Sequence, residues 1–274
     1  MVKILVIGDL HGNLGKVKKI PIEKVDLILL TGDLGKSDLA RKFAFGNRKR
    51  ISKGLKEKEY SAKASQKAHM EIHNSTLSLL KYLSKFAPVY TIQGNVGIST
   101  KAESIQNVKK YKLKHPSTKE EIDKLDKVFL IKNRLRILNN LRIGFLEYFI
   151  DNSWIREFKE KDKKRIKLAK KETAKAKRVL SRFKNLDILI CHQPPYGILD
   201  KVSSKWGAPK DWWGKYAGSK VILNYIKKQE PKYVFCGHIH EGEGKAKIGN
   251  TKIFNLGVAG YKIINLHASP KISR

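Results

Sequence analysis

Short apolar runs separated by polar, lysine-rich stretches alternate along the first part of the chain. The runs at 2–7, 26–31 and 89–93 have the length and near-continuous hydrophobicity of strands that are buried on both faces of a sheet. Between them, the apolar spacing at 60–86 predicts an amphipathic helix, and a shorter basic helix is expected at 13–20. This alternation of strands and helices is typical of an α/β layered fold.

The second half of the chain predicts more strands with fewer helices between them. We expect strands at 127–131, 135–138, 142–145, 187–190, 233–236, 245–248, 252–256 and 261–266. The strongly basic segment 154–184 and the segment from 218 to about 228 are interpreted as helices. Because several strands follow one another without a crossover helix, antiparallel or mixed pairing is expected. The stretches 36–58, 97–125 and 193–217 show too little periodicity to predict an element.

Residues with metal-binding side chains directly follow five of the predicted strands. The motifs are Gly8-Asp9-Leu10-His11-Gly12-Asn13, Gly32-Asp33, Gly94-Asn95, Cys191-His192 and Gly237-His238-Ile239-His240. Open α/β sheets place their sites at the carboxyl ends of strands. The motifs supply carboxylate, amide and imidazole ligands, a mixture that suits Mn²⁺, Fe, Zn²⁺ or Ni²⁺. Two such metals, roughly 3.5–4 Å apart, can clamp a phosphoryl group for in-line attack.

The spread of the motifs along the chain bears on domain organisation. Asp9 and His240 must meet at one site although they lie near opposite ends of a chain of 274 residues. We therefore expect a single domain over 1–274, with basic insertions near 36–58, 97–125 and 154–184.

As a set, the five motifs resemble the calcineurin-like metallophosphoesterase superfamily, which has Asp-x-His, Gly-Asp, Gly-Asn, a lone His and Gly-His-x-His in this order. The resemblance implies a four-layer αββα sandwich with mixed β-sheets and two metals at its edge. It also implies that Asp9, His11, Asp33 and His240 hold the first metal, and Asp33, Asn95, His192 and His238 the second. A hydroxide that bridges the metals would be the nucleophile. Manganese is the expected metal, with iron, zinc or nickel as alternatives.

The second half carries a closer resemblance. Cys191-His192-Gln193-Pro194-Pro195-Tyr196-Gly197, Gly218-Ser219-Lys220, Cys236-Gly237-His238-Ile239-His240-Glu241 and Ile248-Gly249-Asn250-Thr251 are similar to a small prokaryotic branch described as Icc-like phosphoesterases. Membership of that branch implies the type of reaction, phosphoester hydrolysis, more firmly than the identity of the substrate.

One motif departs from the superfamily pattern. Many members have a histidine after Gly-Asn that acts as a general acid, whereas this chain has Val96. Losing a general acid costs about 10²–10⁴-fold in rate, and less when the leaving group is acidic. A phosphodiesterase is therefore favoured, with a nuclease, an RNA-end phosphodiesterase or a phosphomonoesterase as alternatives. His69, His73 and His115 are candidates to replace the acid, although His69 and His73 are better interpreted as exposed histidines without a special role.

The net charge bears on the partner. The chain has 58 Lys and Arg against 25 Asp and Glu, a formal charge of +33. Such a field attracts polyanions, so the phosphoester substrate could be a nucleotide or a nucleic acid. A solvated lysine-rich surface explains the charge equally well. An alternative that is not an enzyme is a non-catalytic nucleic-acid-binding module on the same fold. The complete set of candidate metal ligands argues against this alternative.

Four aromatic residues follow His192, namely Trp206, Trp212, Trp213 and Tyr216. They could form a rim that stacks on a base, or they could pack down a long loop, which is the favoured interpretation.

Cysteine usage and hydropathy bear on localisation. Cys191 and Cys236 give no disulfide framework, the first residues lack a signal-peptide pattern, and no apolar run approaches about 18 residues. A cytoplasmic protein without a membrane partner is expected, and the oligomeric state is left open.

Overall fold

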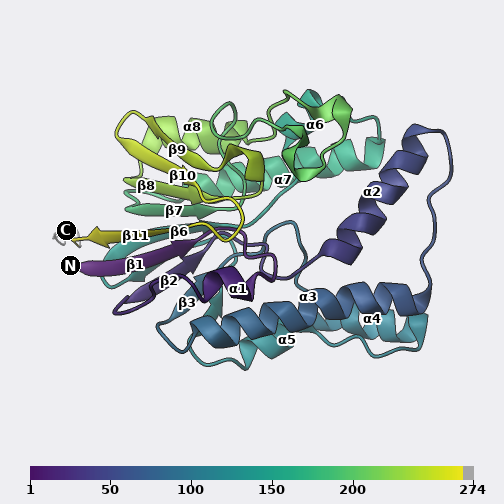
Figure 1. The fold of residues 1–274 in the computed structure, drawn as a ribbon. Coiled ribbons are helices and arrows are strands. Elements are labelled where there is room, and N and C mark those ends of the chain that lie inside the picture. Colours follow the sequence, from purple (N-terminus) through teal and green to yellow (C-terminus); the bar gives the residue numbers. More distant parts are fainter. Residues whose placement is uncertain (268–274) are drawn as a thin grey trace.

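The computed structural model describes residues 1–267, so positions 268–274 of the predicted domain lie outside the described residues. Two mixed sheets lie face to face between helical layers, which confirms the predicted four-layer αββα sandwich (Figure 1). The first sheet has the order β11 (Tyr261–Leu266), β1 (Val2–Ile7), β2 (Leu27–Leu30), β3 (Val89–Thr91) and β4 (Val128–Leu130). In it, β1 to β4 run parallel and β11 pairs antiparallel with β1.

The second sheet is also mixed. Its order is β5 (Arg134–Leu138), β6 (Leu141–Leu146), β7 (Ile188–Cys191), β8 (Tyr233–Cys236), β10 (Thr251–Asn255) and β9 (Gly244–Ile248). The central strands β6, β7, β8 and β10 are parallel, whereas β5 and β9 pair antiparallel at the two edges. Parallel central strands bring the carboxyl ends of β7 and β8 to one edge of this sheet.

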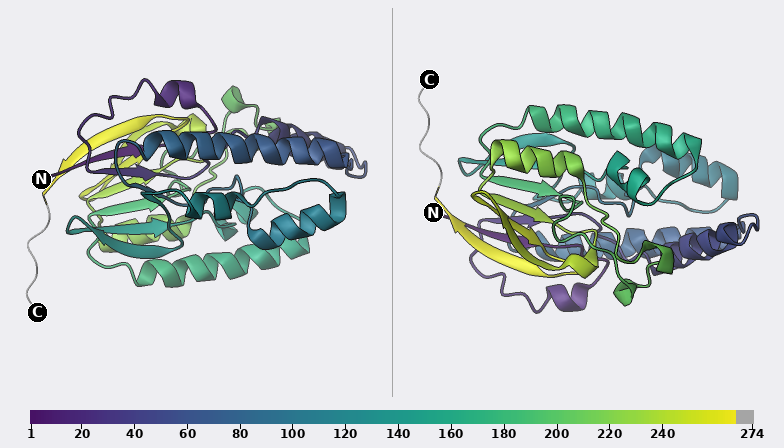
Figure 2. Two further views of the ribbon diagram at one scale, coloured as in Figure 1. Left: turned by 90° about the horizontal axis from the view of Figure 1, so that it is seen from below. Right: turned by 90° about the horizontal axis from the view of Figure 1, so that it is seen from above.

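Helices cover the outer face of each sheet, as the views in Figure 2 show. The helices on the first sheet are α1 (Leu14–Val17), α3 (Ala62–Leu83) and α5 (Thr118–Asp123), and those on the second are α7 (Lys163–Ser181) and α8 (Lys220–Gln229). Three further helices, α2 (Asp38–Ser52), α4 (Lys101–Tyr111) and α6 (Asn152–Glu157), lie toward the strand ends. Short 3₁₀ turns occur at η1 (Ser204–Trp206), η2 (Lys210–Trp212) and η3 (His240–Gly242). Among residues 1–267, no helix has the length and hydrophobicity needed to cross a membrane.

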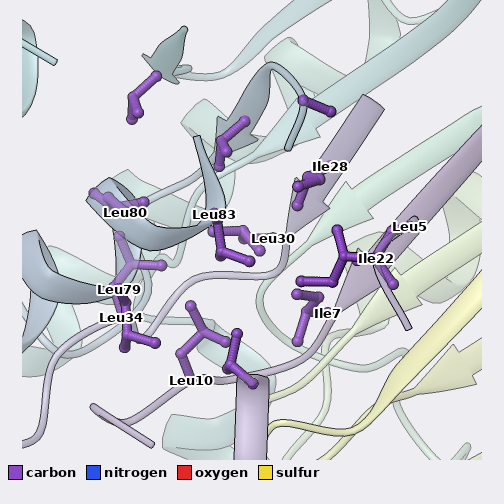
Figure 3. Close-up of a cluster of buried hydrophobic side chains, with 14 of the residues drawn as sticks. Leu5, Ile7, Leu10, Ile22, Ile28, Leu30, Leu34, Leu79, Leu80 and Leu83 are labelled. Atoms are coloured by element: carbon purple, nitrogen blue, oxygen red, sulfur yellow. The ribbon is translucent and has the colours of Figure 1, made fainter. Parts of the chain in front are cut away.

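The core forms three apolar layers because side chains alternate between the faces of each strand. In β1, Leu5 and Ile7 face the cluster under α3, whereas Ile4 and Val6 face the second sheet. Figure 3 shows Leu5, Ile7, Leu79, Leu80 and Leu83 in one buried cluster, and the last three lie on the amphipathic helix expected at 60–86. A strand buried on both faces requires this near-continuous apolar sequence.

Three segments differ from the prediction or fill a gap in it. The expected single helix at 154–184 is wrong, because α6 ends at Glu157 and the Asp162 side chain caps a new helix by accepting a hydrogen bond from Lys164 N. The basic stretch 36–58 contains α2, and 97–125 contains α4 and α5. No residue of α4 is buried, and its apolar Ile105 and Val108 stay exposed, so this short helix has only a weak apolar pattern from which to recognise it.

Candidate metal centre

The five motifs converge at one end of the two sheets. The parallel strands β1, β2 and β3 end on the same side of the first sheet, and β7 and β8 do so in the second. The motif residues are Asp9 and His11 after β1, Asp33 after β2, Asn95 after β3, His192 after β7, and His238 and His240 after β8. Hydrogen bonds join the two sheets here, from the His238 amide to Asp9 and between His192 and the carbonyl of Thr31.

One group of ligand atoms consists of Asp9, His11 and His240, whose ligand atoms all lie within 4.8 Å of one another. The Nε2 atoms of His11 and His240 are 3.1 Å apart, and His240 Nε2 lies 3.3 Å from Asp9 Oδ2. Two imidazoles and a carboxylate facing one point could hold a divalent cation.

A second group forms around His192. Its Nε2 lies 2.8 Å from Asn95 Oδ1, and this oxygen is 2.7 Å from His238 Nδ1. His192 Nδ1 lies 2.9 Å from the Thr31 carbonyl, which can only accept a hydrogen bond, so Nδ1 carries the proton. The Nε2 atom of His192 therefore presents a lone pair toward Asn95, as a metal ligand must.

The Asp33 carboxylate faces both groups. Its Oδ2 is 3.8 Å from His11 Nε2, and its Oδ1 is 3.7 Å from His192 Nε2. Asp9 also approaches both groups, but it contacts His192 at Nδ1, 3.7 Å away, which is the nitrogen already directed at Thr31. Asp33 is therefore the carboxylate better placed to bridge two metals.

Asp9 is fixed by its neighbours. Its side chain is completely buried, accepts a 2.9 Å hydrogen bond from the Thr31 hydroxyl, and accepts another from the His238 amide. Burial raises the pKa of Asp9, but His192, His240 and His11 outweigh it and lower this pKa to about 2. The carboxylate is therefore ionised at neutral pH, which is the form that binds metal.

Two of the imidazoles, His11 and His238, are held in their neutral form. Burial lowers the pKa of His11, against the opposing charges of Asp33 and Asp9. Burial, together with the neighbouring His192, lowers the pKa of His238 well below its ordinary value. Neutral imidazoles beside ionised carboxylates are the donor set that divalent metals require, so these residues fit a metal centre.

The backbone is strained at several ligand positions. His11, Asp33 and His238 have positive φ angles of 42°, 40° and 65°. Residues other than glycine rarely adopt this region, and each costs on the order of 1–3 kcal/mol unless the surroundings impose it. Such residues concentrate at functional sites, where a sharp turn directs a side chain.

Two motif glycines leave room for the carboxylates. A Cβ at Gly94 would lie 2.1 Å from Asp33 Oδ1, and a Cβ at Gly237 would lie 2.2 Å from Asp9 Oδ1. Any other residue would displace an acidic side chain, which explains the glycine that precedes Asn95 and His238.

A cavity of about 440 Å³ is lined on one side by members of both ligand groups, including His11, Asp33 and His240. Tyr148 lines it as well, and its ring centroid lies 5.4 Å from that of His238. Burial raises the pKa of the Tyr148 phenol to about 12, so this hydroxyl is protonated at neutral pH.

Sequence reasoning missed several residues around the centre. Thr31 could have been found, because it stands between an apolar strand and Asp33. Tyr148 follows the carboxyl end of β6, and this position after a strand is a weaker indication of the same kind. Arg41 on α2 and Arg165 on α7 also line the cavity, and nothing in their local pattern distinguishes them from the many other basic residues.

The interpretation of His69 and His73 as exposed histidines is wrong. His73 is buried, and its Nδ1 lies 2.9 Å from the Thr118 hydroxyl, while His69 Nε2 lies 2.9 Å from the Pro116 carbonyl. His115 is also buried. The cavity lining includes none of the three within the described residues, so they do not stand where the missing general acid would act.

The aromatic loop after His192 divides into two parts. Trp206 and Trp212 line the cavity, whereas Trp213 is exposed and donates a hydrogen bond to the Ala208 carbonyl. Tyr216 packs against Tyr196, with ring centroids 5.5 Å apart. Part of the loop is therefore packing, as expected, and part faces the cavity.

The two cysteines lie on the adjacent strands β7 and β8 and are completely buried. Burial raises the pKa of both the Cys191 and Cys236 thiols, so they are protonated and unreactive.

Comparison with known proteins agrees with this geometry. The sequence model of the family described as calcineurin-like phosphoesterase matches residues 2–242. The human and mouse proteins named metallophosphoesterase domain-containing protein 1 are each 35% identical over 83 residues, which is 29% of this chain. The match spans only 23% of the length of these relatives.

Structural comparison supports the fold. One solved structure aligns over 96% of this chain and 94% of its own length, with a TM-score of 0.56 and 15% sequence identity. The family match covers most of the chain and includes all seven motif residues. The chain therefore belongs to the calcineurin-like phosphoesterase family.

Proposed function

We propose that this protein is a dinuclear metal-dependent phosphodiesterase. The observation that carries the proposal is the convergence of Asp9, His11, Asp33, Asn95, His192, His238 and His240 at one end of the two sheets, beside a cavity. When bound, two divalent ions supply Lewis-acid charge to the phosphoryl oxygens and activate water for in-line attack.

The chain's own residues prepare the site in two ways. Asp9 and Asp33 bring negative charge into a buried environment, and Asp33 stands between the two imidazole groups. Thr31 orients His192 through its carbonyl and Asp9 through its hydroxyl, so that their metal-facing atoms stay fixed. The mixture of oxygen and nitrogen ligands favours manganese, with iron, zinc or nickel as alternatives.

The preference for diesters rests on Val96. This residue lines the cavity next to Asn95, and its backbone amide donates a 2.7 Å hydrogen bond to Asp33. Its side chain cannot protonate a leaving group. A diester with an acidic leaving group depends less on such a proton than a monoester of a simple alcohol does.

Hydrolysis of bis(4-nitrophenyl) phosphate and 4-nitrophenyl phosphate, with metal-stripped and Mn²⁺-loaded protein, tests the proposal. We expect Mn²⁺-dependent turnover of the diester, lost in His240→Ala. Monoester turnover that exceeds diester turnover would overturn the diester preference while keeping the metal centre. Metal-independent turnover would overturn the metal mechanism itself.

A Val96→His variant sharpens this test. If the absent acid sets the preference, the new imidazole should raise turnover of an alkyl phosphate monoester, measured as released phosphate, by about tenfold or more, a part of what a general acid usually contributes. Diester turnover should change much less.

Nucleic acid is a second candidate substrate, supported by the charge of +33 and by α7. Ala169, Ala176 and Leu180 of α7 are buried. Its exposed basic residues include Lys163, Lys167, Lys170, Lys171, Lys177 and Arg178. Binding of single-stranded RNA that weakens steeply between about 50 and 200 mM salt would support this candidate. Salt-independent or undetectable binding would remove it.

A further inference from the structure

Tyr148 lies beside the candidate metal ligands, and the proposed function assigns it no role. It follows the carboxyl end of β6 and lines the cavity together with Asn95, Val96 and His238. Its ring centroid lies 5.4 Å from that of His238 and 5.7 Å from that of His192, which it meets edge-on. The ring is therefore in contact with both imidazoles of the second ligand group.

The hydroxyl of Tyr148 is an unused hydrogen-bond donor. Among residues 1–267 it has no protein partner, and its oxygen is not one of the buried polar atoms, so solvent reaches it. After burial, the charges of Arg165 and Asp33 have the largest effects on the pKa of this phenol, and both residues line the same cavity. By contrast, the hydroxyls of Tyr196 and Tyr225 each donate to a protein acceptor, as tyrosines with little exposure usually do.

The segment that carries Tyr148 is irregular but closely held. Four consecutive backbone amides, those of residues 147–150, each donate a hydrogen bond to a different part of the chain. In this order, the acceptors are Asn133 Oδ1 at 3.1 Å, the Gln93 carbonyl at 2.9 Å, Gln193 Oε1 at 3.3 Å and Glu172 Oε2 at 2.6 Å. A functional side chain that is fixed in this way needs no rearrangement to act.

Two of these contacts tie Tyr148 to the ligand motifs. Gln93 lies two residues before Asn95, and Gln193 directly follows His192. Gln93 belongs to the segment after β3 of the first sheet, whereas Gln193 belongs to the segment after β7 of the second sheet. Because the contacts come from both sheets, Tyr148 keeps a fixed place relative to Asn95 and His192 together.

Val96 offers no side-chain donor at the position after Asn95. Its apolar side chain lines the cavity, and its amide is already used by Asp33. A phosphoryl group at the metal centre carries anionic oxygens, and preorganised donors that face these oxygens stabilise the charge that develops during attack. The Tyr148 hydroxyl is such a donor, and it approaches from the second sheet, opposite the segment that carries Val96.

We propose that Tyr148 is a catalytic residue whose hydroxyl donates a hydrogen bond to an oxygen of the phosphoryl group under attack. This inference rests on the proposed function and deepens it, because it adds to the reaction a donor outside the seven motif residues. The negative charge of the accepting oxygen grows in the transition state, so the bond contributes more to turnover than to substrate binding.

Tyr148→Phe tests this role because it removes the hydroxyl and keeps the ring beside His192 and His238. With the Mn²⁺-loaded full chain, we expect kcat for bis(4-nitrophenyl) phosphate to fall about 10–100-fold with little change in KM, the loss typical of a hydrogen bond to a charged oxygen. Manganese content, measured by mass spectrometry, should equal that of the parent. A variant with the parent kcat would overturn the inference, and so would a fall in kcat that accompanies a loss of manganese.

Binding of orthovanadate provides a measurement that needs no turnover. Vanadate can adopt the five-coordinate geometry of phosphoryl transfer, whereas inorganic phosphate stays tetrahedral, so the two probes compare a transition-state analogue with a ground-state one. In calorimetric titrations of the Mn²⁺-loaded protein, Tyr148→Phe should bind vanadate about tenfold or more weakly than the parent and should lose less affinity for phosphate. Equal vanadate affinity of parent and variant, or a parent that binds no vanadate, would overturn the inference.

Tyr196→Phe is the matched control. Tyr196 also has a partly exposed ring, but its hydroxyl donates to Glu157 Oε2 at 2.9 Å, and the residue lies outside the lining of the cavity. Neither diester turnover nor vanadate affinity should change in this variant. Equal losses in Tyr196→Phe and Tyr148→Phe would contradict a specific role of the Tyr148 hydroxyl.

The two readouts also separate this inference from the proposed function. Parent protein that binds vanadate more tightly than Tyr148→Phe does, but hydrolyses neither chromogenic ester, would overturn the proposed function and leave Tyr148 as a residue that binds phosphoryl oxygens. Parent and variant proteins that hydrolyse the diester equally well and bind vanadate equally well would overturn the role of Tyr148 alone.

Discussion

Two groups of histidines in this chain have similar ring spacing and very different surroundings. The strand-end cluster consists of His11, His192, His238 and His240, and the α3 cluster consists of His69, His73 and His115. His192 and His238 have ring centroids 4.9 Å apart, and His69 and His115 have theirs 5.0 Å apart. Ring spacing alone therefore does not distinguish a candidate metal centre from a packed group of histidines.

The carboxylates make the difference. In the strand-end cluster, Asp9 and Asp33 each lie within 4 Å of imidazole nitrogens. In the α3 cluster, His69 and His73 contact the Pro116 carbonyl and the Thr118 hydroxyl, which are neutral. Burial lowers the pKa of His73 and His115 as it does for His11 and His238, and the charge of Glu121 opposes this effect at His73. Among residues 1–267, however, only the strand-end histidines have buried carboxylates within 4 Å of their ring nitrogens, where they can help to hold a cation.

The difference between the two clusters is tested most directly by making the same substitution in each. His192→Asn removes a nitrogen that faces Asn95 and Asp33, so kcat/KM for the diester should fall by at least about 10²–10³-fold, the cost of losing one positioned electrostatic group. His73→Asn should leave kcat/KM nearly unchanged. Metal content measured by mass spectrometry should fall only in His192→Asn. Equal losses of activity and metal in both variants would remove the distinction.

The strand-end cluster could be predicted from sequence because its signals are local. Each ligand follows an apolar strand, and Gly32, Gly94 and Gly237 mark the sharp turns or close approaches that direct the side chains. The strands β1 and β7 are recognisable because burial on both faces requires continuous hydrophobicity. The α/β class and the seven candidate residues follow from these patterns, whereas the four-layer sandwich and the assignment of these residues to two metals are what the resemblance to the superfamily implies.

The remaining features depend on long-range packing, which a local pattern does not record. His115 meets α3 only because the loop after α4 turns back onto it, and α4 itself buries none of its residues. Arg41 and Arg165 reach the cavity from helices far apart in sequence. The break between α6 and α7 comes at Lys159, which has a positive φ of 50°, and Asp162 caps the new helix; both lie in a stretch of mixed Lys, Glu and Asp without Gly or Pro to mark a boundary.

A smaller effect is expected at Thr31, which supports the carboxylate without touching the metal. Thr31→Val keeps the size of the side chain and the carbonyl that orients His192, but removes the hydroxyl that donates to Asp9. Metal affinity should fall about 10–100-fold, as for other residues that orient metal ligands. Titration of the apoprotein with Mn²⁺ against a competing chelator measures it.

Thr251→Val is the matched control for that experiment. Thr251 is also completely buried, but within the described residues its hydroxyl has no hydrogen-bond partner. Metal affinity should therefore stay the same in this variant. If Thr251→Val weakened metal binding as much as Thr31→Val, the loss would reflect core packing rather than the support of Asp9.

The smallest effect is expected in the α3 cluster and concerns stability rather than activity. Burial lowers the pKa of His115 below its ordinary value of 6.5, and the nearby His69 adds to this. The unfolded chain therefore binds a proton more readily than the folded chain does. The stability that comes from keeping His115 neutral is fully present above about pH 6.5 and is lost as the pH falls below it.

His115→Phe should remove this contribution to the pH dependence. The ring keeps its place beside Tyr111 and His69, and two buried nitrogens without partners among residues 1–267 disappear. Because an unsatisfied buried polar group costs about 1–3 kcal/mol, the variant should be as stable as the parent at pH 7.5 or more stable, and should lose less on acidification to pH 5.5. Urea denaturation at the two pH values measures the change, with diester turnover as the control. An unchanged pH dependence would contradict a role of His115 and would assign the acid sensitivity to the other histidines whose pKa burial lowers, namely His73, His11 and His238.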